Sequence, residues 1–128
     1  AASELNRGQC VRRQMGLTVP GPIQHAMVEA LRDVQDVEAQ ADRYRSRLVR
    51  LVAALRDAGY DASMPQGGLY VWVRALSGDC WKDLGALAKL GIMASPGEFY
   101  GDGSRLRFSS TARDDDVDAA CSRLSRGV

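Results

Sequence analysis

The sequence predicts an α+β fold in which helices cover a small, mostly antiparallel sheet of three to four strands that follows one long helix. Two observations predict this class. Apolar residues recur every three or four positions over residues 37–58, and after residue 60 the pattern changes to short β-rich runs bounded by glycine and proline. Later segments return to helical spacing, so the expected order is helix, two strands, helix, two strands, helix.

Two shorter helices are expected ahead of the long one. Residues 3–17 predict a helix with a weak apolar face, and residues 22–32 predict a second helix with apolar residues at helical spacing. Between them, Pro20 disfavours helix at the residue before it, whereas Pro22 suits the first turn of the helix that follows.

A weaker joint over residues 34–36 marks the expected domain boundary. Residues 1–35 would then be a leading arm that belongs to another structural unit, and residues 36–128 would form the main domain. A chain of 128 residues is long enough for one such core.

The longest periodic element covers residues 37–58 and ends at Gly59, a residue typical of helix C-caps. It amounts to about six turns, so we expect it to cross the whole domain or to bridge to another one. Its apolar stripe consists of Tyr44, Leu48, Leu51, Val52 and Leu55.

Two strands are expected next. Residues 60–64 predict a short edge strand that ends at Pro65, and residues 69–74 predict a central strand because apolar residues occupy both of its faces. Trp72 in this strand, like Trp81 beyond it, is expected in the core.

A helix is expected over residues 80–90, with Asp79 as its N-cap and Gly91 at its end. The residues expected to face inward are Trp81, Leu84, Leu87 and Ala88.

The last section is expected to contain a short strand over residues 92–94, a glycine-rich loop over 96–103 and a strand over 106–110. A final helix opens at Thr111 or at residues 113–114, where acidic residues suit the positive end of the helix dipole. Its buried stripe would be Val117, Ala120, Cys121 and Leu124.

Composition argues against several function classes. The chain has 17 basic and 16 acidic residues and a net charge of +1, so no nucleic acid or anionic membrane is an expected partner. No apolar run approaches the roughly 20 residues that span a bilayer, and a cytoplasmic protein is the expectation. Cys10, Cys80 and Cys121 with the single His25 lack metal-ligand spacing, so we expect mostly buried, reduced thiols and no metal site.

Arg107 is the strongest candidate for chemistry. Because side chains alternate along a strand, Arg105, Arg107 and Ser109 should lie on the face opposite Leu106 and Phe108. A guanidinium fixed on a strand is a planar fork that binds a carboxylate with two parallel hydrogen bonds. The alternative from periodicity is an arginine on a solvated face.

The segment before this strand is the second candidate. Gly97, Gly101 and Gly103 surround Phe99 and Tyr100, as a binding loop would require, so Gly97, Phe99 and Tyr100 are candidates for a loop that faces an active site. The alternative is a tight connection whose aromatic pair fills the core.

Three ordered motifs carry a resemblance to a known family. They are Gly67-Gly68-Leu69-Tyr70-Val71-Trp72-Val73, residues 91–101, and Arg105-Leu106-Arg107-Phe108-Ser109-Ser110. Together they resemble the C-terminal part of the class I/II aminotransferases, which are pyridoxal-phosphate enzymes of fold type I. Residues 19–24 resemble the end of the large domain of these enzymes, and the 37–58 helix resembles their interdomain helix. Tyr100 departs from the pattern, since it is inserted between the aromatic residue and the glycine of the second motif.

The narrower resemblance is to actinobacterial N-succinyldiaminopimelate aminotransferases of lysine biosynthesis. It implies that the full-length enzyme uses pyridoxal 5'-phosphate to move an amino group between an amino acid, such as N-succinyl-diaminopimelate or glutamate, and a 2-oxo acid. Arg107 falls where the family places the arginine that binds the substrate α-carboxylate. Lys82 and Lys89 do not match the family's Schiff-base lysine. This chain alone is therefore expected to hold no cofactor, to contribute no catalytic residue and to be inactive.

Two explanations of such a chain stay open. In the first, it is the C-terminal small domain of an aminotransferase and is expected to associate as a homo-oligomer or with the N-terminal large domain. Alternatively, it is a stand-alone binding or regulatory α+β module, or a degenerate remnant, which would need a stable core without the leading arm.

Overall fold

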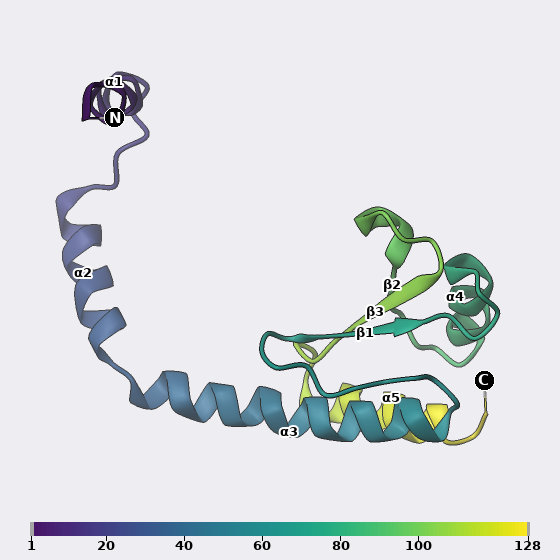
Figure 1. Ribbon diagram of the computed structural model, residues 1–128. Helices are drawn as coiled ribbons and strands as arrows, with labels where there is room; N and C mark the ends of the chain where they lie inside the picture. Colours follow the sequence, from purple (N-terminus) through teal and green to yellow (C-terminus); the bar gives the residue numbers. More distant parts are fainter. Residues whose placement is uncertain (1, 128) are drawn as a thin grey trace. The chain divides into compact units, whose positions relative to one another are not determined.

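Residues 2–127, which the computed structural model describes, form five α-helices, one short 3₁₀ helix and a three-stranded antiparallel sheet (Figure 1). The predicted α+β class is confirmed. The chain divides into two units, residues 1–38 and 39–128. None of the described helices is both long and apolar enough to cross a membrane.

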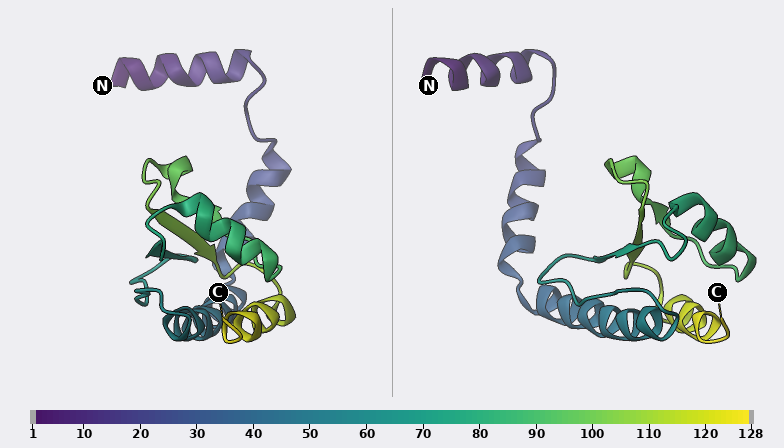
Figure 2. Two further views of the ribbon diagram at one scale, coloured as in Figure 1. Left: turned by 90° about the vertical axis from the view of Figure 1, so that its right-hand side faces the viewer. Right: turned by 45° about the vertical axis from the view of Figure 1, so that its right-hand side comes forward.

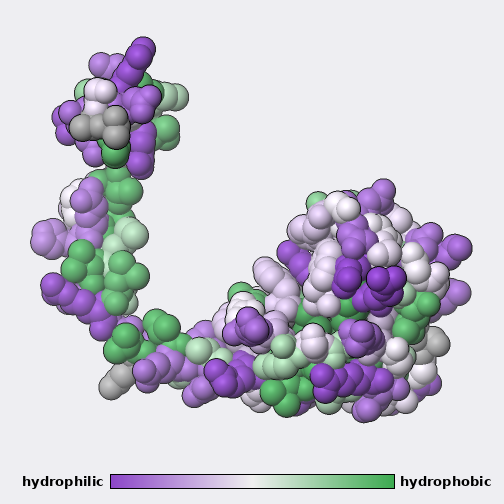
Figure 3. Space-filling model, viewed as in Figure 1, coloured by the Kyte–Doolittle hydropathy of each residue, from purple (hydrophilic) through white to green (hydrophobic). Residues whose placement is uncertain are grey.

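The first unit contains two helices, α1 (Ala2–Gln14) and α2 (Gly21–Arg32), as the spacing and the prolines predict. The backbone between them is extended at Pro20, and a second proline lies in the first turn of α2. All described side chains of residues 3–38 are exposed. Exposed apolar side chains occur along this unit, and Figure 3 shows apolar surface over α2, which carries Ile23, Met27, Val28 and Leu31.

The long helix α3 (Gln35–Asp57) is confirmed, and its predicted stripe contributes to the core except for Tyr44, which is only half-buried. Leu48, Leu51, Val52 and Leu55 are each no more than 4% exposed. Gly59 has a φ of +93°, a left-handed conformation that ends the helix at little steric cost.

The sheet has the strand order β1-β3-β2, with β1 (Tyr70–Arg74) and β2 (Ser95–Pro96) both antiparallel to β3 (Arg105–Ser109). Trp72 pairs with Arg107 in the β1–β3 register. β3 is therefore the central strand. The prediction of a central strand at residues 69–74 is wrong, since β1 lies at the edge.

The two other predicted strands, residues 60–64 and 92–94, do not form, because their backbone groups bond locally. The N–H of Ala62 donates to the carbonyl of Tyr60, and Arg56 Nε donates to the carbonyl of Ala62 at 2.6 Å. The N–H of Ile92 donates back to the helix carbonyl of Leu87 at 2.9 Å. Pairing with β3 begins only at β2.

One face of the sheet packs on helices and the other is open. The core joins the inward side chains of β1 and β3 to residues of α3, α4 (Cys80–Lys89) and α5 (Asp114–Leu124). Figure 2 shows α3 and α5 side by side beneath the sheet. The inward strand residues are Val71, Val73, Leu106 and Phe108.

Helix α4 begins as predicted, and two of its predicted inward residues, Leu84 and Leu87, do pack in or against the core. Asp79 caps it by accepting hydrogen bonds from two backbone N–H groups, and the chain turns at Gly91 with a φ of +68°. The buried positions are Cys80, Asp83 and Leu87, so Trp81, one residue along the helix, points away and is 53% exposed. Ala88 is also exposed. The core position predicted for Trp81 is therefore wrong.

Trp72 is likewise not a core residue. It lies on the open face of β1 and is 37% exposed, because the strand's buried positions are the alternate ones. The three cysteines are free thiols, of which Cys80 is buried and Cys121 half-buried. Cys10 is exposed, contrary to the expectation of mostly buried thiols.

The carboxylate of Asp83 organises the turn between β1 and α4. It accepts hydrogen bonds from the backbone N–H groups of Leu76 at 2.6 Å and Ser77 at 3.1 Å, and from the hydroxyl of Tyr60 at 3.4 Å. Burial and the neighbouring Asp83 carboxylate raise the pKa of Tyr60 to about 12. This buried acid is held by backbone donors rather than by a basic side chain.

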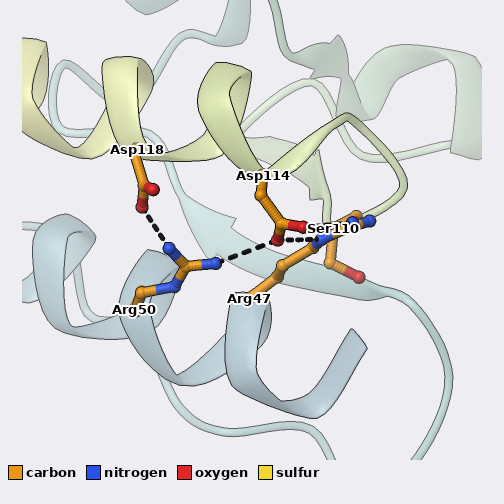
Figure 4. A network of polar contacts seen from close by, with 5 residues as sticks. All are labelled: Arg47, Arg50, Ser110, Asp114 and Asp118. Atoms are coloured by element: carbon orange, nitrogen blue, oxygen red, sulfur yellow. Dashed lines mark hydrogen bonds and ion pairs between the residues drawn. The ribbon is translucent and has the colours of Figure 1, made fainter. Parts of the chain in front are cut away.

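An ion-pair network joins α3 to α5 (Figure 4). The buried Arg47 donates from Nε and Nη2 to the two carboxylate oxygens of Asp114, at 2.8 and 3.0 Å. Arg50 contacts Asp114 at 3.2 Å and also pairs with Asp118. The hydrogen bond from Arg47 is the main cause that lowers the pKa of Asp114.

Replacing Asp83 with alanine is expected to lower the free energy of unfolding by about 2–4 kcal/mol, because two backbone donors in the turn would lose their acceptor. Urea denaturation measures this loss. Asp61→Ala is the matched control, since Asp61 is an exposed carboxylate. Equal losses for the two variants would contradict the role given to Asp83.

The Arg47–Asp114 ion pair is expected to make the free energy of unfolding decrease at low pH. Asp114 has a lowered pKa in the folded chain, so its contribution is present above the ordinary value of 3.8 and is lost as the pH falls through the folded value. Thermal melting between about pH 6 and pH 2.5 should show a smaller acid-induced loss for Asp114→Asn than for the wild type. Asp116→Asn, in the same acidic run, is the control and should follow the wild type.

Candidate functional site

Arg107 lies in the middle of the central strand and projects to the open face of the sheet. Its strand neighbours Leu106 and Phe108 are buried on the opposite face, as the predicted alternation requires. Tyr70 and Trp72 of β1 lie on the same open face as Arg107, because Trp72 is its cross-strand partner and Tyr70 is diagonal to it.

Two aromatic rings flank the guanidinium of Arg107. Its Cζ atom lies 4.2 Å from the ring centroid of Tyr70 and 4.6 Å from that of Tyr100. These distances are well within the range of cation–π attraction. Arg107 is half-buried, so the alternative of a freely solvated arginine is contradicted.

The guanidinium has more donors than it uses. Nη2 donates one long hydrogen bond of 3.4 Å to the hydroxyl of Ser95 in β2. Nε is buried and has no partner among the described residues. A guanidinium carries five N–H donors, so most of the hydrogen-bonding capacity of this side chain is unused among the described residues.

The predicted loop before β3 is the short 3₁₀ helix η1 (Gly97–Tyr100), which is packed closely against the start of the strand. A Cβ atom on Gly97 would overlap the carbonyl oxygens of Asp102 and Arg105, so only glycine fits there. The N–H of Asp102 donates to the carbonyl of Gly97 at 3.0 Å. Gly97 thus contributes close packing that fixes η1 on the sheet.

The two aromatic residues of η1 point to different surroundings. Tyr100 reaches Arg107 and meets Trp72 edge-on, with ring centroids 5.8 Å apart. Phe99 instead packs on Trp81 of α4, whose indole N–H donates to Glu98. Phe99 is 70% exposed and Tyr100 is 51% exposed, so the alternative in which the pair fills the core is wrong.

Sequence reasoning selected Arg107 and Tyr100 but missed Tyr70 and Ser95. The structure brings all four together from three segments of the sheet and from η1. The signal for Tyr70 was its position two residues before Trp72, which puts it on the same face of the strand. To place Tyr70 beside Arg107, the register of β1 against β3 must also be known, and neither strand's sequence specifies it alone.

The sequence profile of the family described as "Aminotransferase class I and II" matches residues 6–124. This chain belongs to the class I and II aminotransferase family. Among its curated relatives, the 4-dedimethylamino-4-oxo-anhydrotetracycline transaminase OxyQ of Streptomyces rimosus is 43% identical over 118 residues. That alignment covers 90% of this aminotransferase chain and 32% of the relative.

Two other aminotransferases show similar coverage. The probable aminotransferase Rv1178 of Mycobacterium tuberculosis is 42% identical, over 90% of this chain and 28% of its own length. The LL-diaminopimelate aminotransferase of Oleidesulfovibrio alaskensis is 32% identical, over 80% of this chain and 28% of its own. The chain therefore spans about a third of the length of the curated relatives it matches.

Solved aminotransferase structures share the fold. A Thermus thermophilus aspartate aminotransferase variant, complexed with tryptophan, superposes with a TM-score of 0.79 at 25% identity. The match covers 91% of this chain and 32% of that enzyme. The aspartate aminotransferase of Thermotoga maritima gives a TM-score of 0.69 at 20% identity, which shows the fold alone.

The two lysines of this aminotransferase chain do not fit pyridoxal phosphate. Lys82 and Lys89 both lie exposed on α4. An amine that holds this cofactor as an active nucleophile has a lowered pKa, which requires desolvation or a second nearby cation. Their exposed surroundings on α4 supply neither condition.

Proposed function

We propose that this chain supplies the carboxylate-binding part of an aminotransferase that moves an amino group between an amino acid and a 2-oxo acid. The observation that carries the proposal is Arg107, a guanidinium held between two rings with donors to spare. Both substrates of such a reaction bear a carboxylate next to the reacting carbon. One arginine can therefore orient the amino acid and the 2-oxo acid in turn.

In this proposal Arg107 binds and orients the substrate. Two parallel hydrogen bonds from a planar fork fix both the position and the plane of a carboxylate, which limits rotation at the adjacent carbon. Pyridoxal phosphate, when bound, supplies the electron sink for the reaction at that carbon. The residues that hold it lie outside this chain in our proposal, so the chain alone does not transaminate.

The proposed substrate class follows the relatives and the resemblance. The name of the Oleidesulfovibrio alaskensis relative specifies LL-diaminopimelate, an amino acid with more than one carboxylate. This supports N-succinyl-diaminopimelate or glutamate as the amino donor and a place in lysine biosynthesis. We place the enzyme in the cytoplasm, associated either as a homo-oligomer or with its large domain.

A second function is favoured by one observation, namely that the core is self-contained. Every buried apolar residue of the described chain lies between Leu48 and Leu124, within the second unit. A stand-alone module that binds small carboxylates through Arg107 needs such a core. Reconstitution of the enzyme distinguishes the two proposals.

A chimera is expected to restore the reaction. In it, residues 6–124 replace the matched third of the Streptomyces rimosus transaminase. The purified chimera should show the visible absorbance of bound pyridoxal phosphate and should transaminate, whereas the 128-residue chain should do neither. Absorbance of bound cofactor in the isolated chain would contradict the proposal, and a folded but inactive chimera would favour the stand-alone module.

Within the chimera, Arg107→Ala is expected to lower kcat/KM for a dicarboxylic amino acid by about 100-fold or more, because two charge-assisted hydrogen bonds are lost. Arg74→Ala is the matched control, since Arg74 is an exposed arginine on the same face of the sheet. Its kcat/KM should stay within about twofold of the unmodified chimera. Unchanged kinetics for the Arg107 variant would show that the carboxylate binds elsewhere.

A further inference from the structure

We propose that Tyr100 is a positioning residue for Arg107 and determines which anions the guanidinium accepts. The inference rests on the proposed carboxylate role of Arg107 and gives a specific role to Tyr100, so far only a candidate member of a loop that faces the site. Tyr100 reaches the guanidinium from η1. The second ring in contact with it, that of Tyr70, comes from the edge strand β1. The two rings therefore close on the guanidinium from separate segments.

The two rings limit how a ligand can approach the guanidinium. Cζ lies 4.2 Å from one ring centroid and 4.6 Å from the other, and at these distances the rings flank the guanidinium. Nε is buried, and Nη2 carries only the long bond to Ser95. The terminal nitrogens are the donors that remain for a ligand, and in our proposal the ligand meets them in the plane of the guanidinium.

Tyr100 is held in place without help from Arg107. Trp72 meets its ring edge-on at an interplanar angle of 84°. The backbone of η1 is fixed by the close packing of Gly97 and ends at Gly101, whose N–H donates to the carbonyl of Glu98 at 3.0 Å. Because the ring is positioned by Trp72 and by the fixed backbone of η1, it can restrict the arginine rather than follow it.

Restriction by the rings should select the shape of the anion. A carboxylate is planar, so both of its oxygens can meet the terminal nitrogens in the plane between the rings. Phosphate is tetrahedral, and its remaining oxygens would project toward Tyr70 and Tyr100. Removing the Tyr100 ring would therefore make the Arg107 guanidinium more mobile and would allow tetrahedral anions to bind.

The test uses the full 128-residue chain, labelled with ¹⁵N, and follows the Arg107 Nε–H resonance during titration with succinate and, separately, with inorganic phosphate. The wild type should bind succinate more tightly than phosphate, and its Nε–H should exchange slowly with water. Tyr100→Ala should weaken succinate binding by about threefold to tenfold, because the released guanidinium must then be immobilised when the ligand binds. The variant should also show a smaller difference between its affinities for succinate and phosphate. Its Arg107 Nε–H should exchange faster with water.

Two variants make the result specific to the ring. Tyr100→Phe retains the ring and should behave as the wild type. Phe99→Ala removes a neighbouring exposed ring that packs on Trp81 instead, so it should change neither the preference nor the exchange rate.

The outcomes separate this inference from the proposed function. If Arg107→Ala abolishes succinate binding while Tyr100→Ala matches the wild type, the role of Tyr100 is overturned and that of Arg107 stands. If the wild-type chain does not bind succinate, or Arg107→Ala binds it equally well, the carboxylate role of Arg107 is overturned, and the anion selection assigned to Tyr100 with it.

Discussion

The antiparallel pairing of β1 with β3 is the constraint on which the candidate site depends. Because Trp72 pairs with Arg107, the side chains that form the site share one face of the sheet, and those that form the core share the other. A slip of one residue would exchange the two faces and bury the guanidinium. The need to bury Val71 and Leu106 on the helices therefore also fixes where Arg107 and Tyr70 meet.

The helices make this sheet a rigid support. Arg47 of α3 binds Asp114 at the start of α5 through both carboxylate oxygens, which ties two helices that are far apart in the sequence. The carboxylate of Asp83 in α4 holds the turn after β1 by accepting hydrogen bonds from the backbone N–H groups of Leu76 and Ser77. A binding group is more accurately placed on such a platform than on a free loop. In the proposed function, this platform presents Arg107 to a substrate whose other contacts lie outside the chain.

Helix ends and strand faces could be predicted from the sequence because they depend on neighbouring residues. The caps at Gly59, Asp79 and Gly91 are each set by local backbone preferences and by groups within one turn. The strands at residues 60–64 and 92–94 were wrong for a related reason. Their composition suits a strand, but their backbone groups already bond to Arg56 and to the end of α4. Amino-acid composition does not show that the backbone groups of a segment are already hydrogen-bonded elsewhere.

The sequence by itself determined the helices, the open face on which Arg107 lies, and the motifs by which the aminotransferase family is recognised, since all of these depend on residues close together in the chain. Only the tertiary structure decided that Tyr70 and Tyr100 enclose the guanidinium and that Trp72 and Trp81 are exposed. These outcomes depend on the register between strands that are more than thirty residues apart and on the packing of η1 against the sheet. Such contacts form only when the whole core closes, so no local pattern encodes them.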